Sequence, residues 1–336
     1  MIGGRPTTHE AVAWACHDPV GRRPAIASAA RLAASLPEGA APFAARFPGG
    51  KALAGLIGAG IGRSLTPAMQ EEEAERHGLR LHYQLIDFER SGVGVETLPT
   101  LLAAARQMDF VGLNITYPCK QAVVPLLDDL SEEARAIGAV NTVVNRGGRL
   151  VGYNTDSSGW RWGFERTLPQ ADLSCVVLLG AGGAGSAVAH ALLQMGTGRL
   201  LVHDRIEARA TALAGGLVRR YGVARAVAAT DLAAAMTSAS GLVHATPTGM
   251  AKVPGLPLPV GLLHPDLWVA EVVYVPMQTE LLAAARALGC ATVDGGTMAV
   301  GQAVGAFELF TGLPADAGRM RSHFGRLLAV DRSNQG

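Results

Sequence analysis

Residues 175–196, CVVLLGAGGAGSAVAHALLQMG, decide the fold of this chain. An apolar run predicts a buried strand, a glycine-rich turn follows it, and small and apolar residues then predict a helix. The turn Gly180-Ala181-Gly182-Gly183-Ala184-Gly185 matches the pattern GxGxxG, in the strand–turn–helix context that a dinucleotide site requires. The alternative is a purely structural turn, because the chain contains 42 glycines.

Each glycine of the pattern has a distinct expected use. Gly180 permits the tight turn, Gly182 lets the backbone approach a pyrophosphate, and Gly185 allows the helix to pack closely on the strand. The start of the helix then offers free N–H groups and a partial positive charge to the phosphates.

The next predicted strand, RLLVHD, ends at Asp204, 19 residues after Gly185. A carboxylate at this place accepts hydrogen bonds from the ribose 2′-hydroxyl and repels a 2′-phosphate. Arg205 and Arg209 favour a phosphate instead, or they stack on adenine or lie in solvent. Asp204 therefore predicts NAD as the cofactor in preference to NADP.

Composition excludes several classes of protein. The 336 residues suggest two domains, and 49% hydrophobic against 17% charged residues describes a packed globular chain. The 29 basic and 28 acidic residues give a net charge of +1, which offers nothing to nucleic acid or an acidic membrane surface. No apolar run is long enough to span a bilayer. We expect a soluble protein that acts on small molecules.

The four cysteines are scattered, without a CxxC pair or a paired Cys/His spacing. This pattern argues against a disulfide framework and against any metal site, and it favours a reducing cytoplasm. Residues 1–50 are rich in Ala, Arg, Pro and Gly, and we expect a poorly ordered extension there.

From residue 51 strands and helices alternate, which predicts an α/β fold with parallel strand pairing. The expected elements of the first part are strands 52–58, 81–88 and 110–116, helices 67–78, 95–108 and 122–138, and a hairpin that turns at Gly147-Gly148. After the glycine motif and the strand RLLVHD, the expected elements are strands 224–229, 241–246, 268–274 and 291–295, and a helix 298–312 with one apolar face.

The stretch 112–121, GLNITYPCKQ, is too polar for a loop that only has to turn the chain. Asn114, Thr116 and Lys120 place an amide, a hydroxyl and an ammonium within seven residues of one another. Such side chains can hold a polyhydroxylated molecule.

Eight stretches in order make the chain resemble the shikimate dehydrogenase family over nearly all of residues 53–328. They are SLTP (64–67), GLNITYPCKQAVVPLLD, AIGAVNTVV, GYNTDSSGW, GAGGAG, ATPTGM, VVYVPMQTELLAAARALG and GQAVGAFELFTG. The resemblance implies a two-domain α/β fold, with an N-terminal substrate-binding domain (51–156, completed by helices in 297–330) and a Rossmann-type, doubly wound NAD-binding domain (157–296). The site is expected in the cleft between the domains.

The resemblance implies that Lys120 and Asp156 flank the hydroxyl that is oxidised. Removing a hydride from a secondary alcohol requires its O–H proton to leave, and a Lys beside an Asp can take that proton and stabilise developing charge. The alternative for each is an ordinary surface ion pair.

The other expected substrate contacts follow the same motifs. Ser64 and Thr66 are expected to hold the substrate carboxylate, although Thr66 also suits a helix cap. Tyr274 is expected near the carboxylate or the nicotinamide, with a core tyrosine as the alternative. The residues expected to bind ring hydroxyls are Asn114, Thr116, Asn141, for which a turn role is the alternative, and Gln302.

The nicotinamide side of the site is expected to include Thr246, Gly249, Met250 and Gly295, with core packing as the alternative for Met250. His244 stands where the family usually has Asn, and Glu271 stands where Asp is common.

Two other departures bear on specificity. Ser64-Leu65-Thr66 replaces the usual Ser-x-Ser, and Asp204-Arg205-Ile206 replaces an Asn-Arg-Thr suited to NADP. Both resemble the NAD-dependent quinate/shikimate dehydrogenases, which reversibly oxidise the C3 hydroxyl of quinate or shikimate. An NADP-dependent biosynthetic shikimate dehydrogenase, a relative acting on a modified shikimate such as an amino-shikimate, and a non-catalytic sensor are the alternatives. A monomer or a homodimer is expected.

Overall fold

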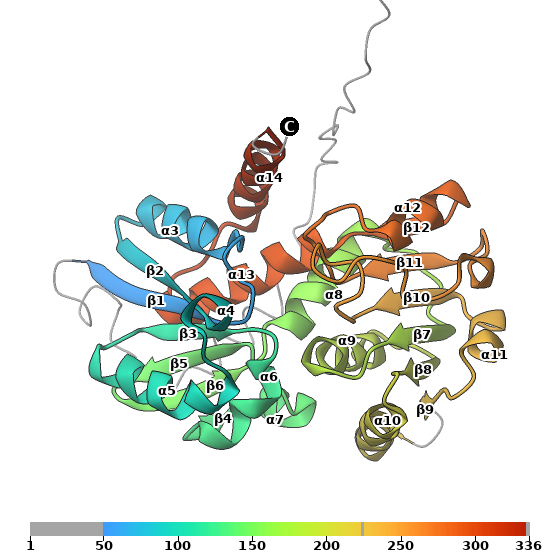
Figure 1. Ribbon diagram of the computed structural model, residues 1–336, viewed down its shortest axis with the longest axis horizontal. Coiled ribbons are helices and arrows are strands. Elements are labelled where there is room, and N and C mark those ends of the chain that lie inside the picture. Colours follow the sequence, from blue (N-terminus) through green and yellow to red (C-terminus); the bar gives the residue numbers. More distant parts are fainter. Residues whose placement is uncertain (1–49, 223–224, 334–336) are drawn as a thin grey trace, which may run out of the picture. The chain divides into compact units, whose positions relative to one another are not determined.

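The computed structural model describes residues 50–222 and 225–333 of the chain. The predicted extension therefore lies, except for Gly50, outside the described residues. Two six-stranded sheets organise the remainder, one built by residues 51–153 and the other by residues 175–293. Figure 1 shows them as a blue-green sheet and a green-to-orange sheet.

The first sheet is mixed and has the order β2-β1-β3-β5-β6-β4. β1 pairs in parallel with β2 and β3, and β4 pairs in parallel with β6. β5 is antiparallel to β3 and β6, because the predicted hairpin turns at Gly147-Gly148. The strands are β1 (Lys51–Gly58), β2 (Arg80–Asp87), β3 (Gly112–Ile115), β4 (Asp129–Leu130), β5 (Thr142–Arg146) and β6 (Arg149–Tyr153).

The second sheet is parallel throughout, with the order β12-β11-β10-β7-β8-β9. The order reverses between β7 and β10, and parallel sheets bind their ligands at such a switch point. The strands are β7 (Cys175–Leu179), β8 (Arg199–His203), β9 (Ala226–Ala228), β10 (Gly241–His244), β11 (Trp268–Glu271) and β12 (Ala291–Val293).

The helices cover the sheets and connect the strands. Those of the first part are α3 (Thr66–Arg76), α4 (Phe88–Ser91), η1 (Val95–Thr97), α5 (Leu98–Gln107), α6 (Cys119–Ala122), η2 (Val124–Leu126), α7 (Glu132–Ile137) and α8 (Asp156–Thr167). Those that follow are α9 (Gly183–Gln194), α10 (Glu207–Tyr221), α11 (Leu232–Thr237), η3 (Val260–Leu262), α12 (Glu280–Ala287), α13 (Gly295–Thr311) and α14 (Ala317–Ser333).

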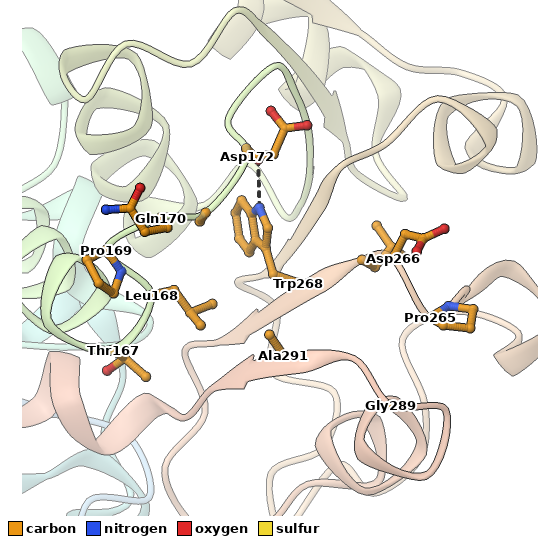
Figure 2. A pocket seen from close by; sticks show the side chains of 12 residues that line it. Thr167, Leu168, Pro169, Gln170, Asp172, Pro265, Asp266, Trp268, Gly289 and Ala291 are labelled. Atoms are coloured by element: carbon orange, nitrogen blue, oxygen red, sulfur yellow. Dashed lines mark hydrogen bonds between the residues drawn. The ribbon is translucent and has the colours of Figure 1, made fainter.

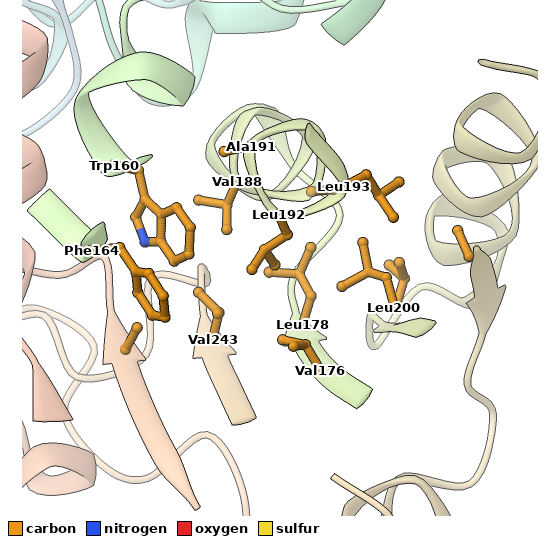
Figure 3. Packing of buried hydrophobic residues seen from close by; sticks show 14 of the residues in the cluster. Trp160, Phe164, Val176, Leu178, Val188, Ala191, Leu192, Leu193, Leu200 and Val243 are labelled. Carbon is orange, nitrogen blue, oxygen red and sulfur yellow. The ribbon is translucent and has the colours of Figure 1, made fainter. Parts of the chain in front are cut away.

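The run CVVLL of β7 is apolar throughout because both faces of the second sheet are covered. Val176 and Leu178 point to the side where α8, α9 and α10 pack, including Trp160 and Leu192 (Figure 3). Val177 and its alternate neighbours point to the opposite side, where α11 and α12 pack. The strand is therefore buried on both sides, as a central strand of a doubly wound sheet must be.

One predicted helix is wrong in extent. Residues 122–138 do not form a mainly helical segment: η2 is followed by the short strand β4, and α7 begins only after Ser131. The Ser131 side chain accepts a hydrogen bond from Ala134 N and starts the helix, and Gly138, with φ +70°, ends it. The capping residues Ser131 and Gly138 thus set the ends of the helix, although the helical spacing of apolar residues begins earlier.

Helix α13 also differs from its prediction, because it is buried nearly all round and not along one face. It crosses α8 very closely: a Cβ on Gly159 of α8 would lie 2.4 Å from Gln302 N of α13. Gly163 and Thr297 form a second close approach in the same pair of helices, where the Cβ position lies 2.5 Å from Thr297 Oγ1. Farther along, Phe310 of α13 covers Gly112 in the first sheet. α13 thus contacts both α8 and the first sheet.

Candidate active site

The first sheet gathers polar residues at one edge. Asn114 of β3 lies opposite Thr142 of β5, and Thr142 lies opposite Tyr153 of β6. The carboxyl ends of β3 and β6 therefore meet the amino end of β5. The segments that leave or enter these strands carry Lys120, Asn141 and Asp156, so strand register alone brings these three distant residues together.

Lys120 and Asp156 form a hydrogen-bonded ion pair, with Lys120 Nζ 2.5 Å from Asp156 Oδ2. Their side chains are 17% and 5% exposed, so the pair is not the surface ion pair that was the alternative. Asp156 begins α8, where the free N–H groups of the helix favour a carboxylate. The neighbouring Cys119 thiol is buried, and this burial raises its pKa to about 11. The thiol of Cys119 thus stays protonated at neutral pH.

A network of short polar side chains fixes Asp156 from the other side. Asn141 Nδ2 donates to Asp156 Oδ1 and to Thr155 Oγ1, each at 2.9 Å. Asn141 Oδ1 accepts from Thr155 N at 2.7 Å and from Thr142 Oγ1 at 3.0 Å. Thr142 and Thr155 are fully buried, and we did not predict either of them as part of the site. Their place directly beside Asn141 and Asp156 in the sequence was the available signal.

Asn114 belongs to the same network. Its Nδ2 donates to Asn141 O at 3.2 Å and to Thr142 Oγ1 at 3.0 Å, and its Oδ1 accepts from Tyr83 Oη at 2.6 Å. Both of its donor hydrogens are therefore committed within the protein. A substrate contact by Asn114 stays a prediction, and it would have to use the remaining acceptor capacity of Oδ1.

Tyr83 was not predicted for the site, although the alternation in β2 places it on the buried face. Burial and, to a smaller extent, the neighbouring Tyr274 raise the pKa of Tyr83 well above its usual value. Burial also raises the pKa of Tyr274, and a hydrogen bond with Ser64 partly offsets this. Both phenols thus remain neutral donors at physiological pH.

Ser64 and Thr66 lie at the start of α3. Ser64 Oγ accepts a hydrogen bond from Thr66 N at 3.3 Å, and no side chain caps the helix. The alternative role of Thr66 as the helix cap is thus not found, and its buried hydroxyl remains available. The association of Tyr274 with Ser64 brings all three residues into one region, next to Tyr83.

Two further predicted residues lie at the edge of this network. Thr116 follows β3 directly, and its methyl group lies against Gly58, where a Cβ would come within 2.4 Å. Gln302 of α13 is joined to the network through its carbonyl oxygen, which accepts from Thr155 Oγ1 at 3.0 Å. Its side-chain Nε2 donates to Ala299 O, so a contact with substrate needs another rotamer or its Oε1.

The glycine turn has the geometry that its predicted use requires. Gly180 has φ +104°, and a Cβ there would lie 2.6 Å from Ala245 O. At Gly185 a Cβ would lie 2.0 Å from Gly180 O, so the helix can approach the turn only with glycine. Gly182 has open space around its Cβ position and precedes α9, which has no side-chain cap. The first N–H groups of α9 are therefore free to meet an anion.

This turn adjoins the ion pair. A Cβ on Gly183, the first residue of α9, would lie 2.9 Å from Cβ of Lys120. The residues predicted for the cofactor and those predicted for proton transfer thus come from different sheets and meet at Gly183.

Asp204 follows β8 and is tied to the glycine turn. Its Oδ2 accepts from Ala181 N at 2.8 Å, and its Oδ1 accepts from Ile206 N at 2.8 Å. Each oxygen keeps a lone pair for a ribose hydroxyl. Arg205, which follows Asp204, and Arg209, in α10, are exposed. Together with the open space at Gly182 and the free N–H groups of α9, these residues fit a dinucleotide.

The residues predicted for the nicotinamide side lie at the carboxyl edge of the second sheet, after β10 and β12. The Thr246 methyl group lies 2.9 Å from the Cβ position of Gly180, and Gly249 has φ +93°. At Gly295 a Cβ would come within 2.5 Å of the carbonyl oxygens of Val272 and Val273. Met250 is 39% exposed, so its alternative role in core packing is excluded.

A pocket of about 430 Å³ lies at the opposite edge of the second sheet (Figure 2). Its walls come from the segment before β7 and from the amino ends of β11 and β12, and Trp268 Nε1 donates to Asp172 O at 2.7 Å across it. None of the predicted site residues lines this pocket. The chemistry expected from the sequence thus belongs to the carboxyl edge.

Among residues 50–222 and 225–333, no helix is both long and apolar enough to cross a membrane. Over the same residues, no three His, Cys, Asp or Glu side chains gather as they would around a metal ion.

Two segments of the chain match known protein families. The shikimate dehydrogenase substrate-binding domain matches residues 56–143, and the shikimate 5′-dehydrogenase C-terminal domain matches residues 295–323. A shikimate dehydrogenase (NADP(+)) of Streptomyces avermitilis is 59% identical over 277 residues, 82% of this chain and 95% of that protein. A quinate/shikimate dehydrogenase (NAD(+)) of Corynebacterium glutamicum is 50% identical, over 81% of this chain and 97% of that protein.

A solved structure shows the same arrangement. Quinate dehydrogenase from Corynebacterium glutamicum, in complex with NAD, superimposes with a TM-score of 0.75 at 48% identity, over 82% of this chain and 98% of that one.

Proposed function

Because the chain belongs to the shikimate dehydrogenase family of NAD(P)-dependent oxidoreductases, we propose that it uses NAD to oxidise the C3 hydroxyl of quinate or shikimate reversibly, giving the 3-dehydro ketone. The observation that carries this proposal is the buried Lys120–Asp156 pair next to the glycine turn.

The pair supplies what alcohol oxidation needs besides a hydride acceptor. NAD, when bound, would supply the hydride acceptor. The hydroxyl proton goes to the Lys120 nitrogen as Lys120 passes one of its own protons to Asp156 Oδ2, and the ammonium kept in this way stabilises the negative charge that develops on the oxygen. Asn141 holds Asp156 Oδ1 and leaves Oδ2 for Lys120, so the pair keeps one orientation throughout the reaction.

The remaining residues divide the substrate between its two ends. Ser64, Thr66 and Tyr274 offer hydroxyl groups near the start of α3, which suits the carboxylate. Thr116, Gln302 and the acceptor oxygen of Asn114 would contact the ring hydroxyls. Asn141, also predicted for this role, would act through Asp156, because its amide is committed to Asp156, Thr155 and Thr142. The methyl group of Thr66, in place of a serine hydrogen, shifts the preference between quinate and shikimate by about 1–3 kcal/mol at most.

For the cofactor, the position of Asp204 supports NAD. Its two oxygens are held at the glycine turn by Ala181 N and Ile206 N, so the carboxylate cannot turn away from a ribose placed there. A 2′-phosphate at the same place would meet this negative charge. The second candidate is an NADP-dependent shikimate dehydrogenase, which the 59% identical Streptomyces relative and the exposed Arg205 and Arg209 favour.

The first experiment is steady-state oxidation of quinate and of shikimate by the purified protein, each with NAD and with NADP. We expect turnover with NAD for at least one of the two acids. Turnover of shikimate with NADP alone would replace the proposal by the second candidate. Turnover of neither acid, with either cofactor, would contradict both.

A further inference from the structure

The second sheet contains a buried polar array that the proposed reaction does not use. His244, at the end of β10, is fully buried, and Glu271, at the end of the neighbouring β11, is 1% exposed. His244 Nδ1 lies 2.9 and 3.0 Å from the two oxygens of Glu271, and His244 Nε2 lies 2.6 Å from Thr246 Oγ1. A carboxylate, an imidazole and a hydroxyl thus form a continuous line that ends at the carboxyl edge.

The surroundings of Glu271 determine which nitrogen of His244 carries the proton. Glu271 Oε1 accepts from the backbone N–H groups of Val272 and Val273, and Oε2 accepts from Thr279 Oγ1. Thr279 Oγ1 accepts from Leu282 N, so its own hydrogen is free to go to Glu271. Donors surround the carboxylate, which therefore acts only as an acceptor. His244 Nδ1 must carry a hydrogen toward it.

The surroundings of Thr246 determine what its hydroxyl can do. Thr246 Oγ1 accepts from Thr248 N at 3.3 Å, which leaves its hydrogen for His244 Nε2. One lone pair of the oxygen then remains, and Thr246 can only accept a further hydrogen bond. Thr246 is partly exposed and packs on Gly180, the first residue of the glycine turn.

We propose that Thr246 Oγ1 accepts a hydrogen bond from the carboxamide NH₂ of the nicotinamide, and that His244 with Glu271 is the positioning pair that keeps this hydroxyl an acceptor. The assignment rests on the proposed dinucleotide function. The carboxamide is the group at the nicotinamide end that offers N–H donors, and Thr246 is the acceptor that the array leaves free. The two ring nitrogens of His244 link Glu271 with Thr246 directly.

The test compares equilibrium binding of NAD with that of 3-acetylpyridine adenine dinucleotide, in which a methyl group replaces the carboxamide NH₂. We expect the wild-type protein to bind NAD about tenfold more tightly, the value of one hydrogen bond. In Thr246→Val and in His244→Asn the preference should fall to within about twofold. Thr246→Ser keeps the hydroxyl and should keep the preference. ADP-ribose lacks the nicotinamide and should bind all four proteins equally.

Three results would overturn the assignment. A preference that persists in Thr246→Val would show that the hydroxyl does not meet the carboxamide. A preference lost in Thr246→Val but kept in His244→Asn would remove His244 as the positioning residue. Failure of the wild-type protein to bind ADP-ribose would instead overturn the dinucleotide site on which the assignment rests.

A spectroscopic measurement tests the positioning pair without any cofactor. In protein labelled with ¹⁵N-histidine, the resonances of His244 are those that disappear in His244→Asn. They should show the tautomer with hydrogen on Nδ1 and a bare Nε2, and Glu271→Gln should shift them. Hydrogen on Nε2 in the wild-type protein would make Thr246 a donor in place of an acceptor and would contradict the proposal.

Discussion

The two sheets prepare their carboxyl edges by opposite means. At the edge of the first sheet the proposed site is built from side chains, because Lys120, Asn141 and Asp156 are joined by hydrogen bonds into one network. At the edge of the second sheet it is built mainly from backbone, because Gly180 and Gly185 leave no room for a side chain and α9 begins with free N–H groups. Asp204 and the array of His244 supplement this backbone surface.

The difference predicts different kinds of failure. A substitution at the first edge removes a charge or a hydrogen bond and should slow the reaction while the fold persists. A substitution at the second edge adds atoms and should either strain the fold or displace the ligand. Matched pairs of variants can separate these effects, since each edge offers a second residue with similar chemistry and a different expected outcome.

The largest effect is expected at the first edge. Lys120→Ala removes the group proposed to relay the hydroxyl proton to Asp156 and to stabilise the developing charge, and kcat should fall about a hundredfold or more. Binding of NAD, measured by fluorescence titration, should change little. Arg106→Ala is the control, because the Arg106–Asp128 pair, which joins α5 to the segment before β4, is 2.6 Å apart but exposed, and kcat should be normal. Near-normal turnover of Lys120→Ala would remove Lys120 from the mechanism.

The next effect is a pH dependence of stability that comes from one buried histidine. His190 of α9 lies 3.0 Å from Tyr221 Oη through its Nδ1, and it forms a hydrogen bond with Ala136 O of α7. Burial and the neighbouring Arg220, against a smaller contribution from Ala136 O, lower the pKa of His190 from 6.5 to about 4.

Between these two values the unfolded chain binds a proton that the folded chain does not bind. Stability is therefore fully present above pH 6.5 and is lost as the pH falls toward 4. Urea denaturation should show about 2 kcal/mol of this loss between pH 7 and pH 5. In His190→Gln this part of the slope should disappear; an equal slope in both proteins would place the pH dependence elsewhere.

A third prediction concerns the backbone surface itself. Gly182→Ala meets no atom within 4 Å, so its thermal unfolding should match the wild type. A dinucleotide drawn against this turn would meet the new methyl group, and its affinity should fall about tenfold. Gly180→Ala is the opposite case, with φ +104° and a Cβ 2.6 Å from Ala245 O, and it should lose about 1–3 kcal/mol of stability. Unchanged NAD affinity in Gly182→Ala would mean that the pyrophosphate binds elsewhere.

The smallest effect is expected where the second edge uses a side chain. Asp204→Asn removes the negative charge and keeps one of the two hydrogen bonds from Ala181 N and Ile206 N, because an amide has a single acceptor oxygen. The ratio of kcat/KM with NADP to that with NAD should rise roughly fivefold, about 1 kcal/mol. Arg209→Ala, which removes a nearby exposed cation, should move the ratio the other way if a 2′-phosphate is bound at all. If neither substitution changes this ratio, Asp204 does not select the cofactor.

The order of elements was predictable because it depends on patterns that are local in sequence. The glycine motif identified the second sheet, and the two-residue turn at Gly147-Gly148 identified the hairpin that makes the first sheet mixed. The prediction of one helix over 122–138 was wrong, because Ser131 and Gly138 limit the helix at its two ends. The strand β4 before it forms by pairing with β6, about twenty residues away in the sequence, and local spacing does not reveal this pairing.

The site was predictable only as far as single residues carry recognisable chemistry. Lys120 and Asp156 were named from their motifs, but Tyr83 and Thr142 entered through strand register, which places them beside Asn114. His244 and Glu271 were visible as departures from the family pattern. Their partnership with Thr246 depends on the neighbouring positions of β10 and β11, which the sequence does not display.

The crossing of α8 and α13 restricts how the enzyme can move. Asp156 begins one helix and Gln302 lies on the other, and Gly159 touches the backbone at Gln302 where a hydrogen atom alone fits. Gly163 and Thr297 form a second close contact between the same two helices. Two such contacts oppose both sliding and rotation of α8 against α13, so the separation between Asp156 and Gln302 is held fixed.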